Sequence, residues 1–291
     1  MMAAGVGRSW LYVPGDRPDR FSKASTSGAD VVICDLEDAV ADANKATARV
    51  AVAAWLRDHR ALVRVNGTDT RWHDEDIAAI TGIPGLAGVV LPKSQGAEQV
   101  SDVAHRLGGR VQVVPLVESA AGVANAAAIA AGPQVSALAF GSIDFALDIG
   151  IDGTDGTDDT DDTDDTDDTE QCALLYARST LVIAARVAGI AAPIDGVTLE
   201  LSDANAVRGD ARRARALGFG GKQCIHPRQV HEVNATFTPS HEALVRAQRI
   251  VDAAETAHGS AVQLDGQMID KPRIDQARRV LGSTQRQGDR T

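Results

Sequence analysis

Short runs of β-prone apolar residues alternate with Ala-rich amphipathic stretches along most of the chain. Runs that are apolar on both faces are typical of parallel strands buried beneath helices. We expect eight such strands, each separated from the next by a helix. They are predicted at residues 9–13, 31–34, 61–66, 86–91, 111–117, 135–140, 191–197 and 218–225.

Eight strands that alternate with helices predict an α/β fold of the (β/α)8 type, a TIM barrel. An open, doubly wound sheet is the alternative, although no Gly-x-Gly-x-x-Gly motif follows the first strand to support a dinucleotide-binding form of it. Two further helical stretches, at about residues 240–258 and 271–281, are more than barrel closure requires. We therefore expect a TIM-barrel domain over residues 1–234 and a C-terminal helical arm or lid over residues 235–291.

A Thr-Asp-Asp repeat follows the sixth predicted strand. Residues 152–170 contain ten Asp and one Glu, with no Lys, Arg or apolar residue. Because such a segment repels itself and has nothing to bury, we expect a disordered acidic loop inserted into the barrel domain. A calcium-binding loop is the alternative, but the spacing lacks the Gly and the terminal Glu of an EF-hand.

The acidic repeat also accounts for the net charge of −11, because the rest of the chain has 29 acids and 29 bases. The body of the protein therefore has no overall field to attract nucleic acid or an anionic membrane. The three cysteines, Cys34, Cys172 and Cys224, are far apart and not paired as metal ligands. Without a signal peptide or a long apolar stretch, the sequence predicts reduced thiols in a cytoplasmic protein.

Acidic residues stand directly after the second predicted strand, at Asp35, Glu37 and Asp38. A single acid there would be expected to cap the next helix, but three together favour a metal or a charged ligand. The carboxyl ends of barrel strands meet on one face. Carboxylates without His or Cys favour a hard ion, Mg²⁺ or Mn²⁺, over zinc. Other polar residues at predicted strand ends are Arg64, Lys93, Glu118, Asp144 and Lys222.

Three cations, Arg17, Arg20 and Lys23, lie at the start of the first predicted helix, where free backbone N–H groups also favour anions. The local pattern fits phosphate binding and a solvated helix face equally well. His226, which precedes a proline, is interpreted as a structural hydrogen-bonding residue rather than a base.

Seven short motifs occur in order at residues 8–15, 35–40, 64–66, 91–93, 115–119, 141–145 and 220–227. Together they resemble the citrate lyase beta-subunit-like branch of the HpcH/HpaI aldolase family. The resemblance extends from about Arg8 to Leu281, nearly the whole chain. It implies a Mg²⁺-dependent barrel that cleaves or forms a carbon–carbon bond next to a coenzyme A thioester.

Matching these motifs residue by residue implies roles for the acids at the strand ends. Glu118 and Asp144 would be the direct metal ligands. Asp35, with its neighbours Glu37 and Asp38, would hold metal-bound water.

The resemblance also implies roles for cations and for the C-terminal arm. Arg64 would bind a 2-oxo acid, and Arg17, Arg20 and Lys23 would lie near the phosphates of coenzyme A. Residues 268–270 resemble a lid motif in which the acid, here Asp270, is supplied by a neighbouring subunit as the acid/base. The active form would then be a homo-oligomer, with a trimer favoured and lids exchanged between subunits.

We therefore expect a lyase that splits a malyl-, citramalyl- or citryl-type thioester into acetyl-coenzyme A and a 2-oxo acid. A thioester hydrolase on the same scaffold is one alternative. A citrate lyase beta subunit that acts only on a carrier-bound thioester is another. Selection among oxo acids that differ by one methyl group depends on pocket volume, and the sequence leaves it open.

Overall fold

The computed structural model describes residues 7–151, 163–256 and 262–288. The chain forms two compact units, residues 1–234 and 235–291. In the part of the chain that is described, no helix is long and apolar enough to cross a membrane.

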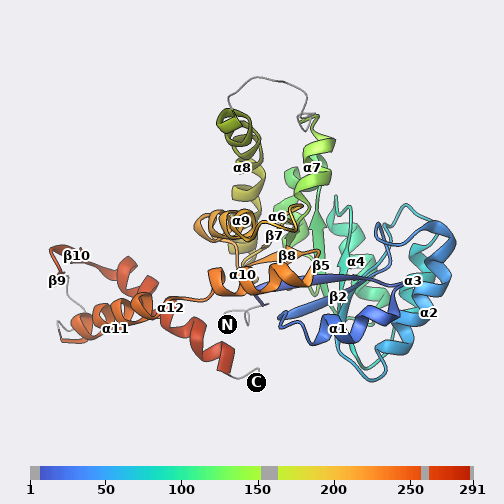
Figure 1. Ribbon diagram of the computed structural model, residues 1–291, viewed down its shortest axis with the longest axis horizontal. Coiled ribbons are helices and arrows are strands. Elements are labelled where there is room, and N and C mark those ends of the chain that lie inside the picture. The colour runs from blue at the N-terminus through green and yellow to red at the C-terminus, as the bar shows by residue number, and fades with distance from the viewer. Residues whose placement is uncertain (1–6, 152–162, 257–261, 289–291) are drawn as a thin grey trace. The chain divides into compact units, whose positions relative to one another are not determined.

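Eight parallel strands of the first unit close into a barrel in sequential order, with β8 hydrogen-bonded to β1 (Figure 1). This confirms the predicted TIM barrel, and the doubly wound alternative is wrong. β6 and β7 are shorter than predicted because only two residues of each keep the ladder geometry. The strands are β1 (Ser9–Pro14), β2 (Val31–Asp35), β3 (Ala61–Arg64), β4 (Leu86–Leu91), β5 (Gln112–Val117), β6 (Ala139–Phe140), β7 (Ile194–Asp195) and β8 (Gly221–Cys224).

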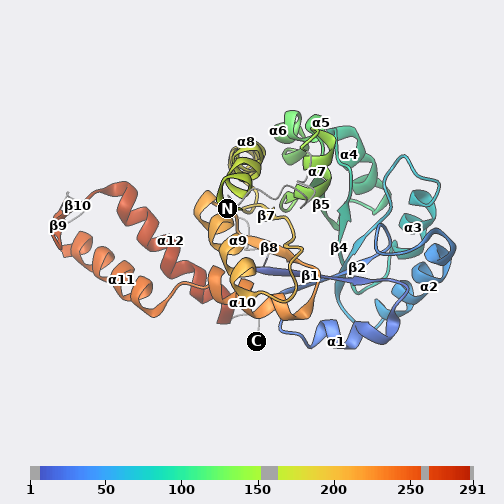
Figure 2. The same ribbon diagram turned by 45° about the horizontal axis from the view of Figure 1, so that its top comes forward.

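Helices lie around the outside of these strands, as Figure 2 shows. Their apolar faces pack on the barrel and their polar faces meet solvent. They are η1 (Pro18–Arg20), α1 (Phe21–Ser25), η2 (Asp42–Asn44), α2 (Lys45–Trp55), α3 (His73–Ile80), α4 (Ala97–Arg106), α5 (Ala120–Ala124), α6 (Ala126–Ala130), α7 (Ser142–Asp148), α8 (Thr163–Ala188), α9 (Ala204–Leu217) and α10 (Pro227–Phe237).

The barrel interior is filled rather than hollow. Each of β1 to β7 contributes to one buried apolar cluster, which includes Trp10, Ile33, Leu62 and Val90. A filled interior leaves the carboxyl ends of the strands as the place where polar side chains can gather around a ligand.

Helix α8 begins at Thr163, inside the acidic repeat. The predicted disordered loop is therefore wrong for residues 163–170, and residues 152–162 lie outside the described residues. The later part of α8 is packed against the barrel through Leu174, Ala177 and Leu181. Asp residues are favourable at a helix amino end, so the packed helix extends into the acidic sequence.

The second unit consists of α11 (His241–Thr256), a hairpin of β9 (Val262–Leu264) and β10 (Gln267–Ile269), and α12 (Lys271–Gly288). The two helices were predicted, whereas the hairpin was missed. Its turn is Asp265-Gly266, in which both residues have positive φ. Asp-Gly between two short apolar runs is a strong hairpin signal that could have identified it.

Candidate active site

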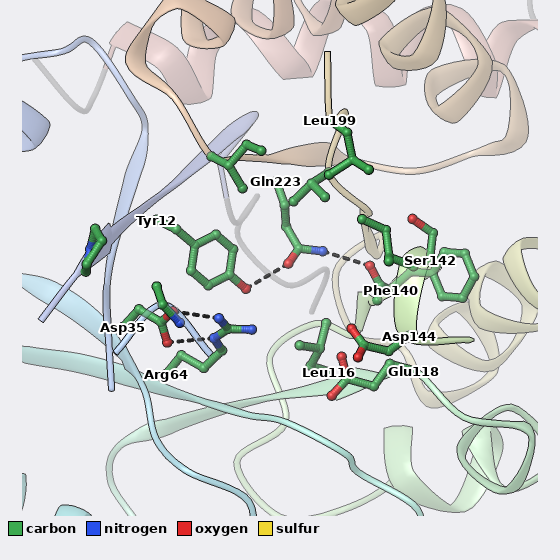
Figure 3. Close-up of a pocket in the computed structure, with 16 residues that line it drawn as sticks. Tyr12, Asp35, Arg64, Leu116, Glu118, Phe140, Ser142, Asp144, Leu199 and Gln223 are labelled. Atoms are coloured by element: carbon green, nitrogen blue, oxygen red, sulfur yellow. Dashed lines mark hydrogen bonds and ion pairs between the residues drawn. The ribbon is translucent and has the colours of Figure 1, made fainter. Parts of the chain in front are cut away.

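A cavity of about 290 Å³ opens at the carboxyl ends of the barrel strands (Figure 3). One part of its lining is charged, with Asp35, Arg64 and Glu118 from β2, β3 and the end of β5. Another part is apolar and comes from the segments that follow β7 and β8. It comprises Val197, Leu199 and Ile225. We call Asp35, Arg64 and Glu118 the charged arc of the lining, and Val197, Leu199 and Ile225 the apolar arc.

Arg64 is fixed by a two-pronged ion pair with Asp35, and both residues line the cavity (Figure 3). Arg64 Nε lies 2.7 Å from Asp35 Oδ1, and Nη2 lies 2.6 Å from Oδ2. The buried Asp35 carboxylate also accepts the backbone N–H groups of Glu37 and Ala39, at 2.9 and 3.2 Å. Because both of its oxygens are engaged by protein donors, Asp35 is better suited to holding Arg64 than to holding metal-bound water.

The Arg64 guanidinium lies over the ring of Tyr12, with Arg64 Cζ 4.8 Å from the ring centroid. Tyr12 donates its hydroxyl hydrogen to Gln223 Oε1 at 2.7 Å. Gln223 Nε2 in turn donates to the carbonyls of Phe140 and Asp195. Burial raises the pKa of Tyr12 well above its ordinary value, so this hydroxyl stays protonated. Both residues were missed, although a glutamine in the fully buried β8 was a usable signal.

Glu118 and Asp144 lie side by side and point into the cavity (Figure 3). Glu118 Oε1 accepts the backbone N–H of Lys93 at 2.7 Å. Burial raises the pKa of Glu118 to about 8, and the charges of Glu37 and Asp144 add to the rise. The site therefore concentrates carboxylates where their negative charges repel one another.

Glu37 contacts Arg64, and its charge also acts on Glu118. Burial raises its pKa to about 7, against the opposing charge of Arg64. Its Oε2 is buried without a well-aligned hydrogen bond and has Arg64 Nη1 at 3.1 Å, while Lys93 Nζ lies 3.7 Å from Oε1. Partial pairing of this kind leaves Glu37 with unused acceptor capacity, although Glu37 is not among the residues that line the cavity.

These observations fit a divalent cation beside Glu118 and Asp144. A cation there would relieve the repulsion that raises the pKa of Glu118. A Cβ at Gly141 would overlap the Glu118 carboxylate, so glycine lets the segment that carries Asp144 approach closely. Within the described residues, no group of three or more His, Cys, Asp or Glu could hold a metal by itself. Mg²⁺ commonly uses one or two carboxylates and completes its shell with water and substrate oxygens.

The buried Lys45 hydrogen-bonds to the backbone of the acidic segment that follows β2. Its Nζ donates to the carbonyls of Leu36 and Glu37, both at 2.8 Å, and to Asn66 Oδ1 at 2.7 Å. The three ammonium hydrogens are thereby matched by three acceptors. Lys45 was also missed, although it shares the apolar face of α2 with Ala48 and Val52 at helical spacing.

Several other predicted site residues lie outside the cavity lining. Asp38 is exposed, with Oδ2 3.8 Å from Arg64 Nη1. Arg17 pairs with the exposed Asp19. Lys222 is buried and donates to the Gly196 carbonyl at 2.6 Å. Arg17 and Lys222 therefore have local partners in this structure.

Arg20 and Lys23 are exposed and lie close enough to His226 to affect it. Burial lowers the pKa of His226, and the charges of Arg228, Lys23 and Arg20 lower it further. These three cations and His226 form a basic cluster on the surface of the first unit.

Asp270 belongs to the second unit, where it is exposed just before α12. Its Oδ1 accepts the backbone N–H of Arg273 at 3.4 Å, as a helix-capping residue does. The structure gives Asp270 this local contact, and its acid/base role stays a prediction.

The sequence model of the HpcH/HpaI aldolase/citrate lyase family matches residues 8–227. The chain is 38% identical to a citrate lyase subunit beta-like protein of Deinococcus radiodurans, across 94% of this chain and 96% of that protein. It is 34% identical to an L-malyl-CoA/beta-methylmalyl-CoA lyase of Cereibacter sphaeroides, across 96% of this chain and 94% of that protein. A (3S)-malyl-CoA thioesterase of the same organism is also 34% identical, with the same two coverages.

Among solved structures, one similar protein is CitE from Mycobacterium tuberculosis in complex with magnesium, acetoacetate and coenzyme A. The TM-score is 0.80 at 35% sequence identity, and the alignment covers 98% of this chain and 99% of that chain. Another structure of CitE from the same organism contains magnesium and pyruvate, with a TM-score of 0.70 and 33% identity over 84% of this chain and 98% of that chain.

Proposed function

Because the chain belongs to the HpcH/HpaI aldolase/citrate lyase family, we propose that it is a Mg²⁺-dependent lyase. The substrate is a malyl-, citramalyl- or citryl-type 3-hydroxyacyl-coenzyme A thioester, and the products are acetyl-coenzyme A and a 2-oxo acid. Relatives at 34% identity are named citrate lyase subunit beta and malyl-CoA lyase, so the chain is a carbon–carbon lyase of this family.

The proposal is supported most strongly by one cavity, which is lined by Arg64, Glu118 and Asp144. A 2-oxo acid carries a carboxylate next to a carbonyl. A Mg²⁺ ion bound by Glu118 and Asp144 would act as a Lewis acid toward its oxygens. The magnesium and oxo-acid ligands of the CitE structures support the same pairing of groups.

Arg64 binds the carboxylate of the oxo acid in this proposal. Its Nε and one Nη2 hydrogen are directed at Asp35, and Nη1 lies 3.1 Å from Glu37 Oε2, which leaves the second hydrogen of Nη2 and one hydrogen of Nη1 for the ligand. Two parallel N–H···O bonds from these groups would fix the plane of the carboxylate. Asp35 positions Arg64 for this task and keeps it charged.

Proton transfer at the acetyl carbon is assigned to Asp270 from the lid of a neighbouring subunit, in a homo-oligomer with a trimer favoured. Asp270 is exposed, so another surface can reach its carboxylate. A general acid or base needs hydrogen-bond reach more than an extreme pKa. Arg20 and Lys23, in the basic cluster with Arg228, bind the phosphates of coenzyme A in this proposal.

Mass spectrometry of the products tests the function. The purified chain is incubated with malyl-, citramalyl- and citryl-coenzyme A, with Mg²⁺ or with a chelator. Acetyl-coenzyme A and a 2-oxo acid, formed only with the metal, are the expected products.

Two alternatives give different products in the same experiment. Free coenzyme A and an intact hydroxy acid would identify a hydrolase, which the relative named (3S)-malyl-CoA thioesterase keeps under consideration. No turnover of any free thioester would indicate a subunit that needs a carrier-bound substrate, in line with the relative named citrate lyase subunit beta.

A further inference from the structure

The orientation of the Gln223 amide is determined by its neighbours. Its Nε2 donates to the Phe140 carbonyl at 2.8 Å and to the Asp195 carbonyl at 3.1 Å. Carbonyl oxygens only accept, so the NH₂ group must face them and Oε1 must face Tyr12. β8 thereby holds a fixed acceptor, anchored on the ends of β6 and β7.

Tyr12 is therefore tied down at its hydroxyl. The O–H donates to Gln223 Oε1 at 2.7 Å, and the phenol ring extends from β1 over the guanidinium of Arg64 (Figure 3). The hydroxyl has one hydrogen, and Gln223 receives it. Tyr12 can then offer a ligand only a lone pair and a ring face.

Asp35 pairs with the Nε and Nη2 groups of Arg64, and Glu37 Oε2 lies 3.1 Å from Nη1 without a well-aligned hydrogen bond. The Nη1 end of the guanidinium is therefore held less firmly than its Nε edge, and the tilt of the plane depends on the Asp35 pair and on what packs against the guanidinium. A cation–π contact with the Tyr12 ring, 4.8 Å from Arg64 Cζ to the centroid, restrains that tilt. Tilt matters because two parallel N–H···O bonds to a carboxylate require the two groups to be nearly coplanar.

We propose that Tyr12 is a positioning residue for Arg64, and that Gln223 anchors Tyr12 from the neighbouring strand β8. The inference rests on the proposed function, since its effect is read as binding of the 2-oxo acid. It gives a task to two cavity residues, Tyr12 and Gln223, that the proposed reaction does not itself use.

Steady-state kinetics in the condensation direction tests the role of the ring. Tyr12→Leu removes the ring and should raise KM for the oxo acid about tenfold, which lies between the effects of an exposed and a desolvated cation–π contact. KM for acetyl-coenzyme A should stay within about twofold, because the ring contacts Arg64, which binds the oxo acid in the proposed function. Tyr12→Phe keeps the ring and should change the oxo-acid KM less than about threefold.

A matched control is available because the chain has two tyrosines. Tyr176 is 74% exposed on α8, so Tyr176→Leu should leave both KM values unchanged. Gln223→Met offers a second perturbation that retains the Tyr12 ring. Loss of the anchor should raise the oxo-acid KM about threefold, which is less than loss of the ring. An unchanged oxo-acid KM in Tyr12→Leu overturns the proposal. If Tyr12→Leu does not fold, an unchanged oxo-acid KM in Gln223→Met overturns it instead.

A double-mutant cycle separates positioning from direct contact. In an Arg64→Ala background, Tyr12→Leu should add no further loss of oxo-acid affinity, measured by isothermal titration calorimetry with Mg²⁺ present. An equal, additive loss means that Tyr12 acts on the ligand by itself, and the positioning role is overturned. If the wild-type chain binds an oxo acid but produces no acetyl-coenzyme A from the three thioesters, the lyase assignment fails while the positioning role is still tested by this cycle.

Discussion

The buried Lys45 offers the sharpest test of how the site is supported. Lys45→Met removes the ammonium group and keeps the apolar stem, so packing along α2 is preserved. The change removes three hydrogen bonds from the segment that carries Glu37. We expect a clear loss of stability in the first unit.

The size of the loss follows from which acceptors are left without a donor. The Leu36 carbonyl keeps Asn66 Nδ2 at 2.9 Å, and the Glu37 carbonyl keeps the Val40 N–H at 2.9 Å. Only Asn66 Oδ1 loses its donor, and an unsatisfied buried acceptor costs about 1–3 kcal/mol.

Two further contributions act in opposite directions. The contact of Lys45 Nζ with the Trp72 ring, 5.2 Å from the centroid, adds about 1 kcal/mol to the loss. The variant no longer has to desolvate an ammonium group, which offsets part of that loss. The net destabilisation is about 2 kcal/mol, which should lower Tm by about 4–8 °C in a domain of this size.

Thermal unfolding followed by far-UV circular dichroism measures the effect. Lys23→Met is the matched control, because Lys23 is exposed on α1 of the same unit and its loss should leave Tm nearly unchanged. A Tm for Lys45→Met within about 1 °C of the wild type would refute the reasoning, since about 2 kcal/mol is expected to give several degrees.

Other parts of the site give further predictions. Glu118→Ala should abolish Mg²⁺ binding in calorimetry; retained binding would remove Glu118 from the ligand set. Since burial raises the pKa of Glu118 to about 8, apparent Mg²⁺ affinity should rise about tenfold per pH unit from about pH 6 and level off above about pH 8; a flat profile contradicts this. Asp270→Ala should keep Mg²⁺ binding and stop turnover, and an active variant would exclude the lid assignment. Deleting residues 154–169 removes the first residues of α8 but keeps its buried Leu174, Ala177 and Leu181, so activity and Mg²⁺ affinity should stay nearly unchanged; a large loss of either would show that the segment shapes the site.

The fold was predictable because its signal is periodic and local. Buried parallel strands appear as apolar runs, and this holds even for β6 and β7, where the ladder is shorter than the run. The helical state of residues 163–170 was not predictable from composition, because these residues continue a helix whose later turns pack on the barrel through Leu174 and Ala177. Composition predicts whether a segment is disordered in isolation, and it does not include the tertiary contacts of neighbouring residues.

The site was predictable only in part. Asp35, Arg64, Glu118 and Asp144 line one cavity because barrel closure brings strand ends together, whatever their separation in sequence. The ion pair between Arg64 Nε and Asp35 could not be predicted from the sequence, because it depends on the register of β2 and β3 and on the rotamer of Arg64. A polar residue inside a predicted buried strand, such as Gln223 in β8, indicates a possible site residue. We overlooked Gln223 because the strand was read only for its burial.

The division of the cavity lining into two arcs bears on how such enzymes diverge. Val197, Leu199 and Ile225 contribute shape to the cavity without belonging to the hydrogen-bonded network around Arg64. Substitutions in the segments after β7 and β8 can therefore alter the room for a substrate side chain while Asp35 keeps its partner. Selection can act on the two arcs separately.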